Sequence, residues 1–299
     1  MSFNYKKGVP IARVMGGSSD GKVIYLDVDG YIDPIKKLSK KFKDEHKDLS
    51  RSEVIQFHKA LRSDIPPVSA KLRKVYYEAK QDIKVLGQDC IDIKDGKLQL
   101  LPRDDMIERL YVSAPSNSGK SYFVGKYLDE YFKKYPESPY YLYSSVAEDE
   151  SLDRQDPERI PIDDDLITDP LTLDDMYDSI VVMDDTNTIR NKKYKTAVNT
   201  IRDIILERGR HNKTRCIITS HILMNYQDSR VVLNESTCTV VFPKSGTTNH
   251  IRNYLKNYVG MSKEQIAKFL KIDSRWIAIY KTNPMFIAWE SGLCLLSAF

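Results

Sequence analysis

Residues 114–121 read Ala-Pro-Ser-Asn-Ser-Gly-Lys-Ser, which is the spacing of a phosphate-binding P-loop. In such a loop successive backbone N–H groups surround nucleotide phosphates, a lysine reaches the β- and γ-phosphates, and a hydroxyl group binds Mg²⁺. Lys120 and Ser121 would supply the lysine and the hydroxyl. The predicted nucleotide-binding residues are Ala114, Pro115, Ser116, Asn117, Ser118, Gly119, Lys120, Ser121 and Tyr122. An ordinary Ser/Gly turn is the alternative interpretation of the same residues.

Two acidic residues follow an apolar run further along the chain. Residues 180–183 are Ile-Val-Val-Met, and Asp184 and Asp185 come directly after them. A P-loop enzyme needs a carboxylate at the end of a neighbouring strand to hold Mg²⁺. We therefore predict that Asp184 is a metal partner together with Ser121, acting through water. Asp185 is predicted to be the catalytic general base or the group that orients the attacking water.

A third polar strand end is a candidate for contact with the γ-phosphate. Residues 216–221 read Cys-Ile-Ile-Thr-Ser-His, an apolar run that ends in polar side chains. His221 or Ser220 would lie near the γ-phosphate and could detect its loss. The alternative is a histidine that only bonds a carbonyl group at the strand end.

An arginine-containing segment lies between the two apolar runs. Residues 207–212 read Glu-Arg-Gly-Arg-His-Asn. An arginine that neutralises charge on the γ-phosphate accelerates hydrolysis by roughly 10³–10⁵. Arg210 or Arg208 could do this, on the nucleotide of a neighbouring subunit, and Arg230 and Arg275 are further candidates. Cations at a helix C-terminus also occur simply because they complement the helix dipole.

From about Met106 onward, predicted strands alternate with predicted helices. This alternation predicts an α/β fold, a P-loop NTPase core with a mainly parallel sheet sandwiched by helices. The predicted buried strands are 109–113, 140–144, 180–183, 216–219 and 239–242, and the helices are 120–133 and 192–208. A C-terminal helix pair (249–258, then a short helix after the capping box at 262–265) and a hairpin of 275–280 with 285–290 complete this part.

Residues 1–105 are predicted to be an accessory α+β region, and residues 106–299 the ATPase domain. Apolar alternation around Gly-rich turns predicts one hairpin from 11–14 with 22–26 and another from 91–93 with 98–100. A capping box at Ser50 predicts a helix through about Leu61, and apolar residues at helical spacing predict a second over 72–83.

The composition bounds the class of protein without identifying a partner. The chain has 299 residues and a formal net charge of +4, which argues neither for nor against nucleic acid. A lysine-rich run at 36–47 and an acidic segment at 148–178 are the usual mark of solvated faces. The four cysteines lie far apart without C-x-x-C spacing, so neither a zinc site nor a disulfide framework is supported. A signal peptide and an 18-residue apolar run are absent, which predicts a soluble protein in a reducing compartment.

Taken in order, these segments resemble the genome-packaging ATPases of large DNA viruses, within the FtsK–HerA superfamily. The resemblance covers about residues 105–299. It rests on the P-loop, on Tyr143-Ser144-Ser145 with acids after it, on Val182-Met183-Asp184-Asp185, on Gly209-Arg210-His211-Asn212 and on the strand ending at His221. It implies ATP and Mg²⁺ as ligands and a homo-oligomeric ring that drives double-stranded DNA into a preformed capsid. It further implies a capsid or portal component as a possible partner, no membrane, and a location in the host cytoplasm (virus factory) or in the virion.

Two other functions remain open on the residues alone. A P-loop kinase that phosphorylates a small molecule would need an arginine-rich lid, and the acidic segment 148–178 is a poor lid for an anionic nucleotide. A non-catalytic, nucleotide-switched interaction protein would usually lack one of the four residues Lys120, Ser121, Asp184 and Asp185, which are all present here.

Overall fold

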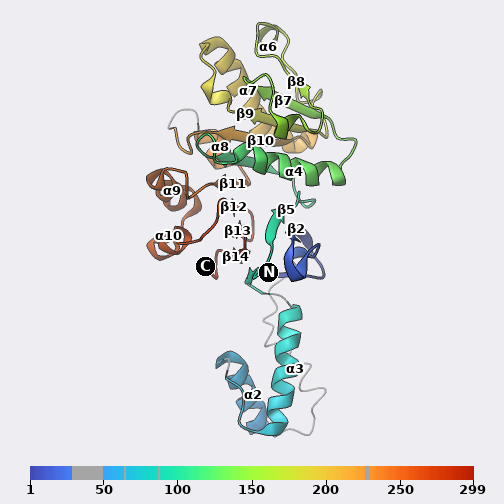
Figure 1. Cartoon of the computed structure of the whole chain (residues 1–299), viewed down its shortest axis with the longest axis vertical. Helices are drawn as coiled ribbons and strands as arrows, with labels where there is room; N and C mark the ends of the chain where they lie inside the picture. Colours follow the sequence, from blue (N-terminus) through green and yellow to red (C-terminus); the bar gives the residue numbers. More distant parts are fainter. Residues whose placement is uncertain (29–49, 64, 87, 226–228) are drawn as a thin grey trace.

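A ten-stranded sheet runs through the molecule in the order β4-β14-β13-β12-β11-β6-β10-β9-β7-β8 (Figure 1). The computed structural model describes residues 1–28, 50–63, 65–86, 88–225 and 229–299, so the lysine-rich run 36–47 lies outside the described residues. The strands from β11 to β8 in this order pair in parallel. They are β6 (Arg109–Ser113), β7 (Tyr140–Ser144), β8 (Glu158–Arg159), β9 (Ile180–Asp184), β10 (Arg215–Ser220) and β11 (Cys238–Val241).

The strands at the other end of this order pair in an antiparallel manner. It contains β12 (Ile277–Tyr280), β13 (Phe286–Trp289), β14 (Gly292–Leu295) and β4 (Cys90–Asp92). The predicted C-terminal hairpin is therefore present as β12 and β13, and β14 extends it by a strand that we did not predict. Before it come α9 (Thr248–Tyr254), the π-helical turn η4 (Leu255–Val259) and α10 (Lys263–Phe269), with the capping box at Ser262 and Gln265 as predicted.

Helices cover both faces of the sheet, as the buried side chains show. Leu110 and Val112 pack in one core cluster with residues of α4 (Lys120–Lys134), whereas Tyr111 belongs to a second cluster with residues of α7 (Lys192–Arg208). This alternation along β6 follows from the period of two of a strand. Helix α8 (Arg230–Glu235) and α9 pack in the second cluster too. The predicted α/β sandwich is confirmed.

Short elements fill several connections. The acidic connection between β7 and β9 contains α5 (Glu150–Asp153), β8 and α6 (Asp165–Thr168). The 3₁₀ turns are η1 (Gly17–Ser19), η2 (Thr186–Thr188) and η3 (Gly209–Asn212).

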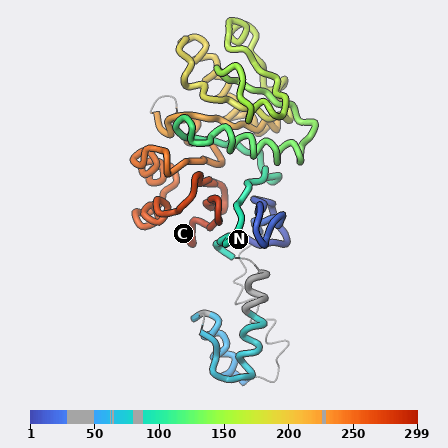
Figure 2. Tube along the Cα trace, in the orientation of Figure 1, coloured from blue at the N-terminus to red at the C-terminus, as the bar shows by residue number. Residues whose placement is uncertain are grey.

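The N-terminal residues form a second, four-stranded antiparallel sheet that packs on the antiparallel side of the large one. Its order is β1 (Ser2–Asn4), β3 (Val23–Asp27), β2 (Val9–Met15) and β5 (Lys97–Leu100). Phe3 meets Phe286 of β13 edge to face, with ring centroids 5.5 Å apart, in a shared core. Figure 2 shows these first strands in blue beside the red C-terminal strands. The predicted hairpin of 11–14 with 22–26 is confirmed.

Between β3 and β4 the chain forms a pair of helices with a core of its own. Helices α2 (Arg51–Ser63) and α3 (Ala70–Leu86) enclose Phe57 and Tyr76 and extend away from the sheets (Figure 1). The Ser50 hydroxyl accepts from the Glu53 N–H (3.3 Å) and the Glu53 carboxylate accepts from the Ser50 N–H (2.8 Å), which is the predicted capping box.

Two predictions for the N-terminal region are wrong. Residues 91–93 and 98–100 do not form a hairpin, because β4 pairs with β14 and β5 pairs with β2, so the two strands belong to different sheets. Alternation defines which face a strand buries but leaves its partner open. In addition, Cys90 and Cys294, opposite one another on β4 and β14, form a disulfide, whereas Cys216 and Cys238 are free and buried. The predicted boundary at residue 105 stays a prediction.

The core facing α4 yields a stability prediction. Leu128 is fully buried, and Leu128→Ala should lower the free energy of unfolding by about 2–5 kcal/mol through lost burial and a residual cavity. Urea unfolding monitored by circular dichroism measures this change. Ile204→Ala on α7, where the side chain is 38% exposed, is the control and should cost much less. Equal losses for both variants would contradict the layer arrangement.

Candidate nucleotide site

The predicted phosphate-binding residues lie between β6 and α4, at the edge of the sheet where the parallel strands end. Asn117 (φ 62°) and Gly119 (φ 94°) adopt left-handed conformations within the turn, which glycine and asparagine tolerate best. The Ala114 N–H donates to the Ser220 carbonyl group of β10 (3.0 Å), so the start of the loop is tied to the neighbouring strand. Ser121 and Tyr122 lie in the first turn of α4, while Pro115, Ser116 and Ser118 form the rest of the loop.

Asp184 is the last residue of β9, and its carboxylate is nearly inaccessible to solvent, with 4% of the residue exposed. One oxygen accepts from the Thr219 hydroxyl (2.7 Å) and the other from the Ser144 hydroxyl (3.3 Å). Burial raises the pKa of Asp184 above its ordinary value, and the Thr219 hydrogen bond acts in the opposite direction. Asp184 is thus a hydrogen-bonded but desolvated carboxyl group.

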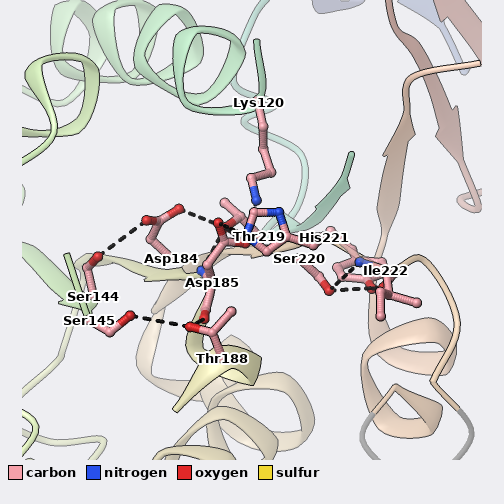
Figure 3. A network of polar contacts seen from close by, with 11 residues as sticks. Lys120, Ser144, Ser145, Asp184, Asp185, Thr188, Thr219, Ser220, His221 and Ile222 are labelled. Carbon is pink, nitrogen blue, oxygen red and sulfur yellow. Dashed lines mark hydrogen bonds and ion pairs between the residues drawn. The ribbon is translucent and has the colours of Figure 1, made fainter. Parts of the chain in front are cut away.

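Asp185 connects the P-loop to the end of β10 (Figure 3). One carboxylate oxygen forms an ion pair with the Lys120 ammonium, and the other lies 3.0 Å from His221 Nε2. The Asp185 backbone is left-handed (φ 45°), and its N–H donates to the Thr219 hydroxyl oxygen (2.9 Å). Lys120, Asp185 and His221, three residues from three separate segments, therefore meet at one point.

His221 and Ser220 have different environments. The His221 Nδ1 atom is buried and has no hydrogen-bond partner among the described residues, so the alternative of a histidine bonded to a carbonyl group is not observed there. The Ser220 hydroxyl instead donates to the Ile222 carbonyl group (2.9 Å) within its own turn. Of the two predicted candidates, only His221 contacts the carboxylate cluster.

Two residues that the sequence analysis did not select complete the site. Thr219 contacts both carboxylate residues, and Ser144, which is opposite Asp184 in the pairing of β7 with β9, contacts one of them. The available signal was a hydroxyl side chain at the C-terminal end of a strand that is otherwise apolar. Ser144 belongs to the motif Tyr143-Ser144-Ser145, whose residues alone do not assign it a role.

Arg210 lies at the other edge of the sheet. It belongs to η3, which follows α7 and precedes the first residue of β10, whereas the P-loop lies where β10 ends. A six-residue strand spans roughly 20 Å, so Arg210 is far from the P-loop of its own chain. Its exposed guanidinium has the neighbouring His211 as a contact, 3.4 Å from Nε to Nε2.

The donor set fits Mg²⁺, which prefers oxygen ligands and retains several water molecules. The Ser121 hydroxyl and the Asp184 carboxylate are both oxygen donors at the P-loop edge of the sheet. A cation near Asp184 would also offset the cost of its buried charge. In the described part of the chain there is no group of three or more His, Cys, Asp or Glu side chains that could bind a metal by themselves. Nor does any helix in that part have the length and apolar character needed to span a bilayer.

Comparison with known proteins gives one relative in sequence and several in structure. The chain is 36% identical over 224 residues to "Uncharacterized protein V3" of Sputnik virophage, which covers 74% of this chain and 89% of the relative. No family model matches the chain.

The similar solved structures have lower identities. The genome packaging NTPase B204 of Sulfolobus turreted icosahedral virus 2, in complex with sulfate, is 13% identical over 60% of this chain and 94% of its own, with a TM-score of 0.43. The pCW3 conjugation coupling protein TcpA is 8% identical over 96% of this chain and 77% of its own, with a TM-score of 0.40.

The burial of Asp184 predicts an unusual pH dependence of stability. Because the folded-state pKa is raised, the charged carboxylate destabilises the fold at neutral pH, and this cost disappears as the pH falls to about 4, the ordinary value for aspartate. Asp184→Asn should therefore increase the free energy of unfolding at pH 7 without added nucleotide or metal. The gain should vanish near pH 4.

Chemical unfolding between pH 4 and 8 measures this gain. Asp169→Asn, at an exposed position, is the matched control and should change stability little at any pH. A loss of stability in Asp184→Asn at pH 7 would contradict the prediction.

Proposed function

We propose that this chain, which belongs to the family of protein V3 of Sputnik virophage, is an ATP-hydrolysing motor that moves double-stranded DNA and packages a viral genome into a preformed capsid. The observation that carries the proposal is the meeting of Lys120, Asp185 and His221 at the P-loop edge of the sheet. Hydrolysis of a γ-phosphate requires a group that contacts the phosphates, a group that activates water and a polar side chain at a strand end.

Each residue has a separate task in this proposal. The P-loop N–H groups and Lys120 bind the phosphates, so Lys120 must exchange its ion pair with Asp185 for the nucleotide. Asp185, released from its ion pair with Lys120, orients the attacking water and accepts its proton. Ser121 and Asp184 would hold Mg²⁺, which neutralises developing charge on the phosphate oxygens when bound. His221, whose Nε2 lies 3.0 Å from the Asp185 carboxylate, is the candidate for contact with the γ-phosphate.

The positions of cationic residues support the proposed assembly and DNA binding. Arg210 lies too far from the P-loop of its own chain to act there, which supports a role on the nucleotide of a neighbouring subunit in a homo-oligomeric ring. Arg190, Lys192 and Lys193 are exposed at the start of α7, directly after the segment that carries Asp185. These residues are candidates for contact with duplex phosphates. A capsid or portal component would be a further partner, in the host cytoplasm or the virion.

Phosphate release by the purified protein, with and without duplex DNA, tests the motor. We expect DNA to stimulate hydrolysis, and we expect Lys120→Ala and Asp185→Asn each to reduce the rate by about 10²–10⁴-fold. Lys133→Ala is the matched control, because Lys133 lies on the same helix with a 62% exposed side chain and should leave the rate unchanged. Hydrolysis that depends on a small-molecule acceptor would instead indicate a kinase, and absence of activity in all conditions would indicate a nucleotide switch.

Mixing two inactive variants tests whether Arg210 acts between subunits. An Arg210→Ala subunit keeps its P-loop, and a Lys120→Ala subunit keeps its arginine. If Arg210 completes a neighbour's site, mixed rings contain interfaces where both groups are intact, so the mixture should recover a fraction of wild-type phosphate release. Mixing Lys120→Ala with Asp185→Asn is the control, since both lesions lie in the same half of the site. No recovery in the first mixture would contradict a role in trans.

A further inference from the structure

Arg275 lies against the P-loop of its own chain. It precedes β12, whose first residue pairs with the last residue of β11, and β11 pairs in turn with β6. A methyl group built on Gly119 would come within 2.7 Å of the Arg275 Nη2 atom, so the guanidinium touches the turn that begins α4. It approaches from the β11 and β12 side, whereas Asp185 and His221 lie on the β10 side.

The backbone of Arg275 is held firmly by its neighbours. Its N–H donates to Glu290 Oε2 (2.8 Å), and the adjacent Ser274 hydroxyl bonds the Trp276 carbonyl group (2.7 Å). The Trp276 ring packs edge to face on Phe123 of α4, with centroids 5.1 Å apart. Such contacts fix the point from which the arginine side chain extends over the P-loop.

Among the described residues, the guanidinium itself has no hydrogen-bonded carboxylate partner. It forms no ion pair within 4.0 Å there, because the Glu290 carboxylate accepts from the backbone N–H of Arg275 and interacts with the guanidinium only electrostatically, without a hydrogen bond. A cation held beside phosphate-binding N–H groups without a carboxylate partner favours an anionic ligand. Because Arg275 lies on the opposite side of the loop from Asp185 and His221, it is closest to the part of a nucleotide that ATP and ADP share.

The N-terminal sheet contributes to this arrangement through Glu290. The second carboxylate oxygen of Glu290 accepts from the Lys97 ammonium (3.1 Å), and the Glu290 carbonyl group accepts from the Leu98 N–H (2.7 Å). Both donors belong to β5, which is part of the four-stranded N-terminal sheet. Burial acts to raise the pKa of Glu290, but the hydrogen bonds from Arg275 and Lys97 bring it below its ordinary value, so the carboxylate is charged at neutral pH.

We propose that Arg275 binds the α- and β-phosphates of the nucleotide in its own subunit, and that Glu290 with Lys97 positions it, so that the N-terminal sheet contributes to nucleotide affinity. This inference rests on the proposed nucleotide site. It also removes Arg275 from the candidates for the arginine that acts on a neighbouring subunit, because the side chain is engaged at its own P-loop.

Equilibrium binding of fluorescent ATP and ADP analogues with Mg²⁺ tests the arginine. A charge-assisted hydrogen bond to phosphate is worth a factor of about 10–100 in affinity. Arg275→Ala should therefore weaken the binding of both nucleotides by that factor, and Arg275→Lys should restore part of it. Lys271→Ala is the matched control, because it removes an exposed cation four residues before Arg275. This variant should bind both nucleotides as the wild type does.

The outcomes separate this inference from the function on which it rests. Unchanged affinity in Arg275→Ala would overturn the inference, and so would a loss confined to ATP, since that would place the arginine at the γ-phosphate. A wild-type protein that binds neither nucleotide would overturn the proposed function and the inference together.

The positioning role needs a separate readout, because Lys97 does not touch the nucleotide in this proposal. Lys97 is 70% exposed, so Lys97→Ala should weaken binding only about two- to fivefold. In an Arg275→Ala background the same change should have no further effect, since Lys97 acts through Arg275. Lys94→Ala is the control, because Lys94 is an exposed lysine in the turn between β4 and β5. An equal loss in both backgrounds would show that Lys97 acts independently and would overturn the positioning role.

Discussion

The Thr219 hydroxyl group holds the two halves of the nucleotide site together. It donates to the Asp184 carboxylate and accepts from the Asp185 N–H, so one side chain of β10 positions the last residue of β9 and the residue that follows it. Strand β10 lies between β9 and the P-loop strand β6, and it pairs in parallel with both. The distance between carboxylates and P-loop is therefore determined by the width of one intervening strand, about 4.8 Å on either side.

The local cost of this arrangement is concentrated at Asp184 and Asp185. One is a desolvated carboxyl group, and the other has a left-handed backbone, which costs a non-glycine residue roughly 1–2 kcal/mol. The Lys120 ammonium stabilises the Asp185 carboxylate through an ion pair, a contact that a nucleotide would rearrange. The surrounding sheet is buried on both faces by helices and can hold these strained residues in place.

Prediction from sequence succeeded where the signal is local. The strand and helix on either side of residues 114–119, the strand that ends in Asp184, the capping boxes at Ser50 and Ser262 and the alternation of strands with helices all depend on residues close together in the chain. The predictions that failed, or that were never made, concern pairing between distant segments. Apolar alternation placed β4 and β5 as strands but could not show that they enter different sheets, and the Cys90–Cys294 disulfide depends on that same pairing of β4 with β14.

The residues of the candidate site divide in the same way, into those indicated by a local motif and those that depend on pairing between distant segments. Lys120, Ser121 and Asp184 stand in motifs whose spacing prescribes a role, and His221 follows an apolar strand. Thr219 was missed because a threonine inside a strand is ordinary until the register shows what faces it. Arg275 was predicted only as one candidate for the arginine that acts between subunits, since nothing local indicates that a residue two positions before β12 lies beside Gly119.

The short strand β1 has a consequence for the helical pair α2 and α3. Phe3 of β1 pairs with Leu26 of β3 on one side and with Gln88, through two hydrogen bonds of 2.7 Å, on the other. The segment that carries the helices therefore leaves and returns on opposite sides of the same three-residue strand. The pair is anchored at two points and acts as a closed loop rather than a free tail. Loop-closure entropy changes slowly with loop length, so a change in the length of this segment should cost little while β1 keeps both of its ends in place.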